Sequence, residues 1–127
     1  MVNFWHKKKV LVTGHTGFKG SWLSLWLNKL GANVTGFSLD PITVPNVYSV
    51  LRLKKYIHDI RGDIRDHNLL KKIINPEEPE VIIHLAAQAL VRTSYYDSLG
   101  TFSTNIMGTV NLLEVARTCK SVKAILI

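Results

Sequence analysis

The chain has one cysteine, few acidic residues and no long apolar run. Cys119 cannot form an internal disulfide, and its place late in an apolar helical pattern favours a packing role over a nucleophilic one. No window approaches the roughly 18 continuous apolar residues that a membrane span requires, and the N-terminal segment has no signal-peptide core. These absences predict a soluble, cytoplasmic protein without a membrane partner.

Close histidine pairs and cysteine partners are also missing, so the five histidines predict no metal site. The formal net charge of +7 is compatible with nucleic acid, an anionic surface or a phosphate-bearing small molecule. The one dense basic run, at 7–9, precedes an apolar strand and has no interleaved aromatic residues on which bases would stack. We therefore expect a solvated edge there and no nucleic-acid partner.

Runs typical of strands alternate with helical periodicity along the chain. The expected strands cover 10–13, 33–38, 56–61, 81–85 and 122–127. The expected helices cover 18–30, 47–53, 66–74 and 98–118, the third of them capped by Asp66 and ended by Pro76 and Pro79. Residues 1–127 are thus predicted to form one α/β domain, a Rossmann-type doubly wound parallel sheet with strand order 3-2-1-4-5 that stops at strand five.

The segment TGHTGFKGSWL places Gly14, Gly17 and Gly20 between the first strand and the first helix. A pyrophosphate at a helix N-terminus is held by backbone N–H groups and the helix dipole, and a Cβ on the loop would keep it too far away. A tight turn without a ligand is the alternative. The strand before the loop and the βαβ unit around it favour a dinucleotide site.

An acidic residue near the end of the second strand ordinarily binds the adenosine ribose. Here Ser38 holds the expected position and Asp40 follows two residues later, so Asp40 either reaches the ribose or only solvates the loop. The segments 62–66 and 85–88 follow strands three and four, where the crevice of such a sheet lies. Asp63 contacts adenine or stabilises a turn, and the small Ala86 and Ala87 leave room for a flat cofactor.

The motifs TGHTGFKG, GDIRD, HLAAQ and TNIMGTVNLLE occur here in the order and spacing of the extended short-chain dehydrogenase/reductase family, the NAD-dependent epimerases and dehydratases. From Lys9 to Ile127 the chain resembles the N-terminal portion of that family. GHTGFKGSWL and LVRTSY are most similar to the branch that dehydrates CDP-glucose, although Ala89 stands where a proline usually follows the glutamine.

The resemblance implies NAD as cofactor and a nucleotide sugar, CDP-glucose, as substrate, with hydride leaving C4, water lost across C5 and C6, and hydride returning to C6. This chemistry belongs to deoxysugar and O-antigen synthesis. The family's catalytic tyrosine and lysine follow the fifth strand, so no catalytic residue is expected within 1–127. The helix at 98–118 is expected to join copies in a homo-oligomer. A related epimerase or reductase, or a non-catalytic dinucleotide-binding module, are the competing hypotheses.

The resemblance also implies a set of contacts with the cofactor and the substrate. The pyrophosphate would lie at Gly14, Thr16, Gly17, Phe18, Lys19 and Gly20, the ribose at Ser38 and Asp40, the adenine at Asp63 and Ile64, and the nicotinamide at Leu85, Ala86, Ala87, Gln88 and Thr104. Arg92 would bind the substrate diphosphate or be a surface charge. Thr104 has the alternative of bonding its own backbone.

Overall fold

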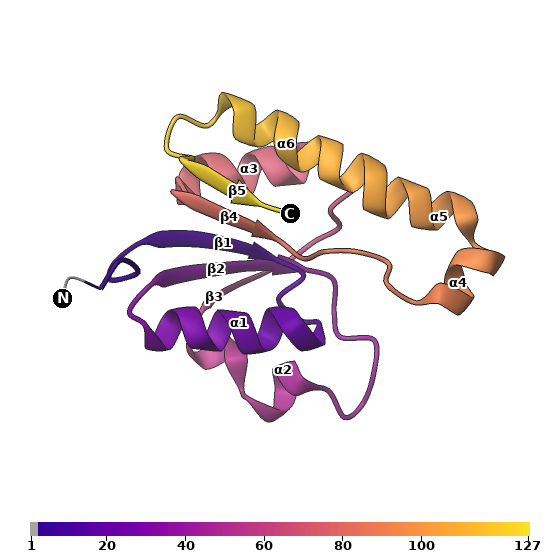
Figure 1. Cartoon of the computed structure of the whole chain (residues 1–127), viewed down its shortest axis with the longest axis horizontal. Coiled ribbons are helices and arrows are strands. Elements are labelled where there is room, and N and C mark those ends of the chain that lie inside the picture. The colour runs from indigo at the N-terminus through magenta and orange to yellow at the C-terminus, as the bar shows by residue number, and fades with distance from the viewer. Residues whose placement is uncertain (1–2) are drawn as a thin grey trace.

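A computed structural model describes residues 3–127 as a parallel sheet between two layers of helices (Figure 1). The strands are β1 (Lys9–Thr13), β2 (Asn33–Ser38), β3 (His58–Arg61), β4 (Val81–His84) and β5 (Ala124–Leu126). They pair in parallel in the order β3-β2-β1-β4-β5. The predicted fold class and strand order are therefore confirmed.

The helices divide between the two faces of the sheet, as right-handed crossovers from a central β1 require. One face carries α1 (Phe18–Lys29), α2 (Val47–Val50) and the 3₁₀ turn η1 (Leu53–Lys55), and the other carries α3 (His67–Glu77) and α6 (Gly108–Thr118) (Figure 1). The connection from β4 to α6 contains α4 (Val91–Tyr96), α5 (Ser98–Phe102) and a π-helical segment, η2 (Ser103–Met107).

Each face of the sheet has its own apolar core, because successive strand side chains point to opposite sides. On β1, Leu11 packs with α3 and α6, whereas Val10 and Val12 pack with α1, α2 and η1. All three side chains are almost completely buried. The central strand is therefore apolar on both faces, as a covered parallel sheet demands.

The aromatic spacing that predicts α1 does not mark its buried face. Phe18, Trp22 and Trp26 are 70%, 51% and 64% exposed, and the residues buried against the sheet are mostly small: Gly20, Ser21, Ser24 and Leu27. The reason lies in the close approach of the helix, since a Cβ on Gly20 would lie 2.1 Å from the Gly14 carbonyl oxygen. Small residues face the sheet because large ones would not fit.

Several helices and strands begin or end at other residues than the sequence predicts. Pro76 does not stop the third helix, which runs to Glu77 and is closed by the left-handed Glu78, whose N–H donates to the Ile74 carbonyl. The third strand begins at His58, two residues later than expected, because Tyr56 closes η1 through a hydrogen bond from its N–H to the Leu53 carbonyl. Helix α4 was not expected, and the helix expected at 98–118 is divided by the π-helical segment. The predicted cap is confirmed: Asp66 accepts from the Leu69 N–H at 2.9 Å.

Candidate functional site

The carboxyl ends of the first four strands meet at one edge of the sheet (Figure 1). The segments that leave this edge are 14–17, 39–46, 62–66 and 85–90. They contain most of the residues that the sequence singles out, and they lie beside one another because adjacent parallel strands end together. The fold thus assembles one candidate site from segments far apart in the sequence.

Two glycines of the TGHTGFKG segment, Gly14 in the loop and Gly20 in α1, are required by packing alone. Gly14 has a φ of +75°, its N–H donates to the Phe37 carbonyl at 2.8 Å, and a Cβ there would lie 2.7 Å from the Ala86 nitrogen. Gly20 lets α1 touch the loop, as described above. These glycines bring β1, β4 and α1 together, and a ligand is not needed to explain them.

Gly17 is different, because nothing in the described chain demands a glycine there. Its φ of −73° suits any residue, and a Cβ would meet only the Gly14 carbonyl oxygen, at 3.3 Å. Gly17 is the N-cap of α1, with no side-chain capping bond and no acidic residue in the first turn. An exposed, uncapped helix N-terminus with open backbone fits an anion such as a pyrophosphate.

Thr16 fastens the end of β2 to the glycine loop. Its buried hydroxyl donates to the Leu39 carbonyl at 2.9 Å and lies 2.8 Å from the Ser38 hydroxyl. Ser38 is therefore held beside the first turn of α1, where the ribose next to a bound pyrophosphate would lie. The side chain of Asp40, which is 86% exposed, lies 3.3 Å from Nε of Arg61.

A buried polar cluster that the sequence does not predict lies next to the ends of β2 and β3. Asp59 accepts from Nε2 of His15 at 2.7 Å, from the Tyr48 hydroxyl at 2.5 Å and from Arg61 at 3.2 Å. The His15 ring lies directly on β2, where a Cβ at Gly36 would come within 2.4 Å of it. A histidine in the glycine loop and an aspartate in a strand were the available signals, but only the fold brings them together.

Burial and hydrogen bonding fix the protonation states in this cluster. Burial lowers the pKa of His15, and Asp59 opposes that shift only in part, so His15 is neutral and donates from Nε2. Burial works to raise the pKa of Asp59, but hydrogen bonds from Tyr48 and His15 outweigh it and the pKa is lowered. Burial, followed by Asp59, raises the pKa of Tyr48 to about 12. Asp59 is thus the charged centre of the cluster.

A second buried histidine joins β1, β4 and α6. Nδ1 of His84 lies 2.6 Å from the Thr13 hydroxyl and Nε2 lies 3.0 Å from the Thr109 hydroxyl. The Thr13 hydroxyl also accepts from the N–H groups of Leu85 and Ala86, which fixes the start of the HLAAQ segment. Burial lowers the pKa of His84, so the ring is neutral.

We expect the free energy of unfolding to fall as the pH drops below about 6.5, the ordinary pKa of histidine. In the unfolded chain His15 and His84 protonate near that pH, but their pKa values in the folded chain are lower, so acid favours the unfolded state. The loss is at most about 1.4 kcal/mol per pH unit for each histidine. Urea unfolding at pH 7.5 and 5.5 measures it. A stability that stays level or rises on acidification would contradict this assignment.

The loop after β3 is held by its own ion pair. Asp63 accepts from Arg65 through both carboxylate oxygens, at 2.6 to 3.0 Å, and hydrogen bonds from Arg65 lower its pKa. Ile64 is buried, and its side chain would collide with a Cβ at Gly108. Asn111 of α6 donates to the Arg65 carbonyl. The loop is therefore fixed, and both the turn role and the adenine contact predicted for Asp63 are compatible with this geometry.

Gln88 is fixed by the helical connection that follows it. Its N–H donates to the Asn105 side chain at 2.8 Å, Asn105 donates back to the Gln88 carbonyl at 3.1 Å, and the Gln88 amide donates to the Thr101 hydroxyl at 2.9 Å. Thr104 lies half-buried in the π-helical segment beside Asn105. Asn105 is a further residue whose role the sequence does not predict, although it lies in the family motif TNIMGTVNLLE.

The substrate residue predicted from the sequence comes two residues after the segment 85–90. Arg92 is exposed on α4, which projects beyond the end of the sheet (Figure 1). Lys19 and Phe18 are exposed on the first turn of α1. Within residues 3–127 no cluster of three metal-ligating side chains occurs, and no helix is both long and apolar enough to cross a membrane.

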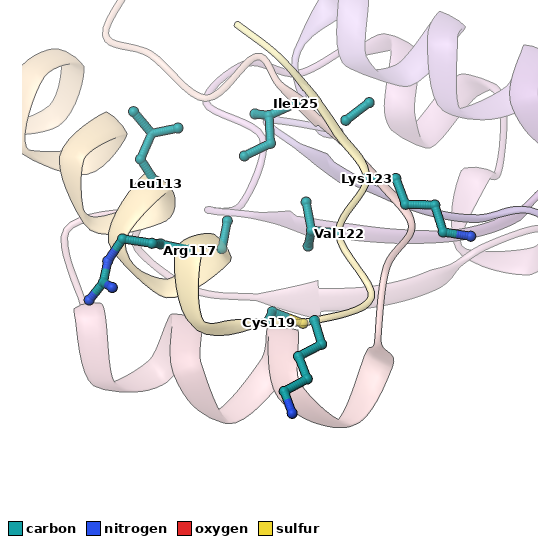
Figure 2. Close-up of a pocket in the computed structure, with 9 residues that line it drawn as sticks. Leu113, Arg117, Cys119, Val122, Lys123 and Ile125 are labelled. Carbon is teal, nitrogen blue, oxygen red and sulfur yellow. The ribbon is translucent and has the colours of Figure 1, made fainter.

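An open groove of about 520 Å³ lies elsewhere, between α6 and β5. Figure 2 shows Leu113 and Arg117 of α6 on one side of it and Val122, Lys123 and Ile125 on the other. Cys119 lines its end and packs against the core beneath α6, as a space-filling residue does. This groove is distant from the carboxyl ends of the central strands, so it is not the candidate dinucleotide site.

Comparison with known proteins finds a family and a set of close structural matches. The sequence model of the family described as GDP-mannose 4,6 dehydratase matches residues 11–127. CDP-glucose 4,6-dehydratase of Salmonella typhimurium is 51% identical over 123 residues, which is 97% of this chain and 34% of that protein. UDP-glucuronate 4-epimerase 6 of Arabidopsis thaliana is 39% identical over 94% of this chain and 27% of its own length.

Solved structures of epimerases share the fold. A UDP-glucose 4-epimerase of Thermus thermophilus in complex with NAD has a TM-score of 0.77 and 30% identity, over 91% of this chain and 35% of that one. An epimerase of Stenotrophomonas maltophila with bound NAD has a TM-score of 0.80 and 25% identity, over 94% and 36%. The chain thus spans about a third of the length of the relatives it matches.

Proposed function

This chain belongs to the GDP-mannose 4,6-dehydratase family, and from that membership we propose that it is the NAD-binding Rossmann domain of a CDP-glucose 4,6-dehydratase. The observation that carries the proposal is the open backbone at Gly17 on the uncapped N-terminus of α1. Packing explains Gly14 and Gly20, whereas a ligand that approaches the backbone closely would account for Gly17.

The described residues fit NAD along the carboxyl edge of the sheet. The first turn of α1 would hold the pyrophosphate through backbone N–H groups, with Thr16 keeping the loop closed. Ser38 would meet the adenosine ribose, and Asp63 with Ile64 would border the adenine. Leu85, Ala86, Ala87, Gln88 and Thr104 would border the nicotinamide, with Gln88 fixed by Asn105.

NAD supplies a hydride acceptor and donor, which allows a sugar to be oxidised at C4 and reduced again at C6. Residues 1–127 supply binding and orientation in this proposal. The proton transfers belong to groups beyond them, as expected from the family resemblance, and Arg92 is proposed to bind the substrate diphosphate. A nucleotide-sugar 4-epimerase is the second candidate, favoured by the 39% identity with the Arabidopsis enzyme.

We also propose that the protein is cytoplasmic and that it forms a homo-oligomer. Cys119 is an unpaired thiol, as in proteins of the reducing cytoplasm. The helical run from α5 to α6 exposes large apolar side chains, namely Leu99, Phe102, Ile106, Val110 and Leu113. Such a stripe on one helical run suits association of two copies, so we propose a homo-oligomer formed through this run.

We expect the chain to bind NAD at least about tenfold more tightly than NADP. A 2′-phosphate beside Ser38 would lie near the carboxylates of Asp40 and Asp59 and the single guanidinium of Arg61, so the net charge there opposes it. Calorimetric titration of both dinucleotides tests the proposed function and this preference together. Binding of neither dinucleotide would overturn the proposed function, and tighter binding of NADP would overturn the preference alone.

A further inference from the structure

We infer that Arg61 is the specificity-determining residue for the 2′ position of the adenosine ribose: it is a preformed phosphate-binding group that Asp40 keeps covered. The inference rests on the proposed function, because it assumes a dinucleotide at this edge. It assigns a role to a residue that lies outside the glycine loop and outside the acidic position at the end of β2. Its basis is the set of contacts around one guanidinium.

Arg61 lies at the end of β3, in register with Ser38 of β2. Its Nη2 donates to Asp59 at 3.2 Å, its Nη1 donates to the Leu39 carbonyl at 3.2 Å, and its guanidinium carbon lies 4.7 Å from the centre of the Tyr48 ring. Its Nε lies 3.3 Å from Asp40. Asp59, the Leu39 carbonyl and the Tyr48 ring therefore hold the guanidinium, and its Nε–H group lies against the exposed Asp40.

The two carboxylates that contact Arg61 are not equivalent. The side chain of Asp59 is 5% exposed and is fixed by Tyr48 and His15, whereas the side chain of Asp40 is 86% exposed. An exposed ion pair contributes little to holding its members in place, but a buried one with further hydrogen bonds contributes much. Asp59 and Tyr48 thus position Arg61, and Asp40 only occupies its outer N–H group.

The charges explain why this arrangement favours a ribose with a free 2′-hydroxyl. With His15 neutral, Asp40, Asp59 and Arg61 together carry one negative charge, which opposes a 2′-phosphate. Without the Asp40 charge, the cluster is neutral and the Nε–H group of Arg61 is no longer held in an ion pair. An arginine fork is well suited to a phosphate, so the same corner would then accept NADP.

The test compares the affinities of four proteins for NAD and NADP: the unchanged chain, Asp40→Asn, Asp40→Asn with Arg61→Gln, and Glu114→Gln. Glu114 is the matched control, because it forms an exposed pair with Arg117 on α6, away from this corner. We expect Asp40→Asn to bind NADP about tenfold more tightly, with the NAD affinity changed by no more than about threefold. The double variant should lose that gain, and Glu114→Gln should show none.

The outcomes separate the inference from the proposed function. If NAD binds but the gain in NADP affinity is absent from Asp40→Asn, or persists without Arg61, then Arg61 is not the phosphate-binding group and the inference is wrong. If the unchanged chain binds neither dinucleotide, the proposed function fails and the inference fails with it. Circular dichroism checks the fold of each variant, and Arg61→Met, which also lacks the positive charge, replaces Arg61→Gln if the latter does not fold.

Discussion

Replacing Gly17 by valine is expected to weaken NAD binding severely and to leave the fold intact. Gly17 has an extended backbone that a β-branched residue adopts readily, and its missing Cβ faces open space apart from one carbonyl oxygen at 3.3 Å. The valine side chain would occupy the place where a pyrophosphate approaches the first turn of α1. We expect the dissociation constant for NAD to rise at least about a hundredfold, measured by calorimetry, with little change in the thermal unfolding midpoint.

The matched variant is Gly20→Ala, for which we expect a lower thermal unfolding midpoint as the primary effect. A Cβ at Gly20 would lie 2.1 Å from the Gly14 carbonyl oxygen and 2.8 Å from the His15 Cα, so it should lower the stability of the fold itself. The pair distinguishes a ligand-binding glycine from a packing glycine within one loop. Unchanged NAD affinity in a folded Gly17→Val variant would show that Gly17 belongs only to a turn.

We expect the chain of 127 residues, incubated with NAD and CDP-glucose, to give no 4-keto product. Hydride transfer from C4 needs a base that removes the proton of the C4 hydroxyl, and acid–base help of this kind contributes on the order of 10² to 10⁴ in rate. Tyr95 and Tyr96 are both more than 80% exposed, and neither has a lysine four residues later. Tyr48 donates to Asp59 and its pKa is raised to about 12, which makes it a poor base.

Product formation is followed by the absorbance of the 4-keto sugar in alkali, with the enzyme omitted as the blank. Steady turnover would place a catalytic base within residues 1–127 and would show that the assignment of a binding role alone is wrong. The Gly17→Val variant is the control here as well, because a rate that survives the loss of NAD binding would come from a contaminating enzyme.

The sequence predicts the sheet well because its signals are local. The apolar run of β1, the glycine loop and the helix after it form a βαβ unit whose parts are adjacent in the chain, and handedness then sets the strand order. The orientation of α1 was not predictable in the same way. Periodicity reports which residues share a face, but whether that face is buried depends on how closely the loop at Gly14 lets the helix approach.

In the candidate site, too, the residues marked by local sequence were predictable and those brought together only by the fold were not. The glycine loop, Ser38 and the HLAAQ segment were predictable, because position at a strand end selects them. The cluster of His15, Asp59 and Arg61 was not, because its members come from separate segments that the sheet register brings together. The pairing of Gln88 with Asn105 joins residues 17 positions apart and likewise depends on the path of the connection.

The measurement that tests the central claim most directly is a titration of the ¹⁵N-labelled chain with NAD, followed by amide chemical shifts. The account predicts that shifts concentrate along the carboxyl edge of the sheet, at residues 14–20, 38–40, 62–64 and 85–88, while the groove between α6 and β5 stays unchanged. Shifts centred on that groove, or none at saturating NAD, would contradict the claim that this edge is the dinucleotide site.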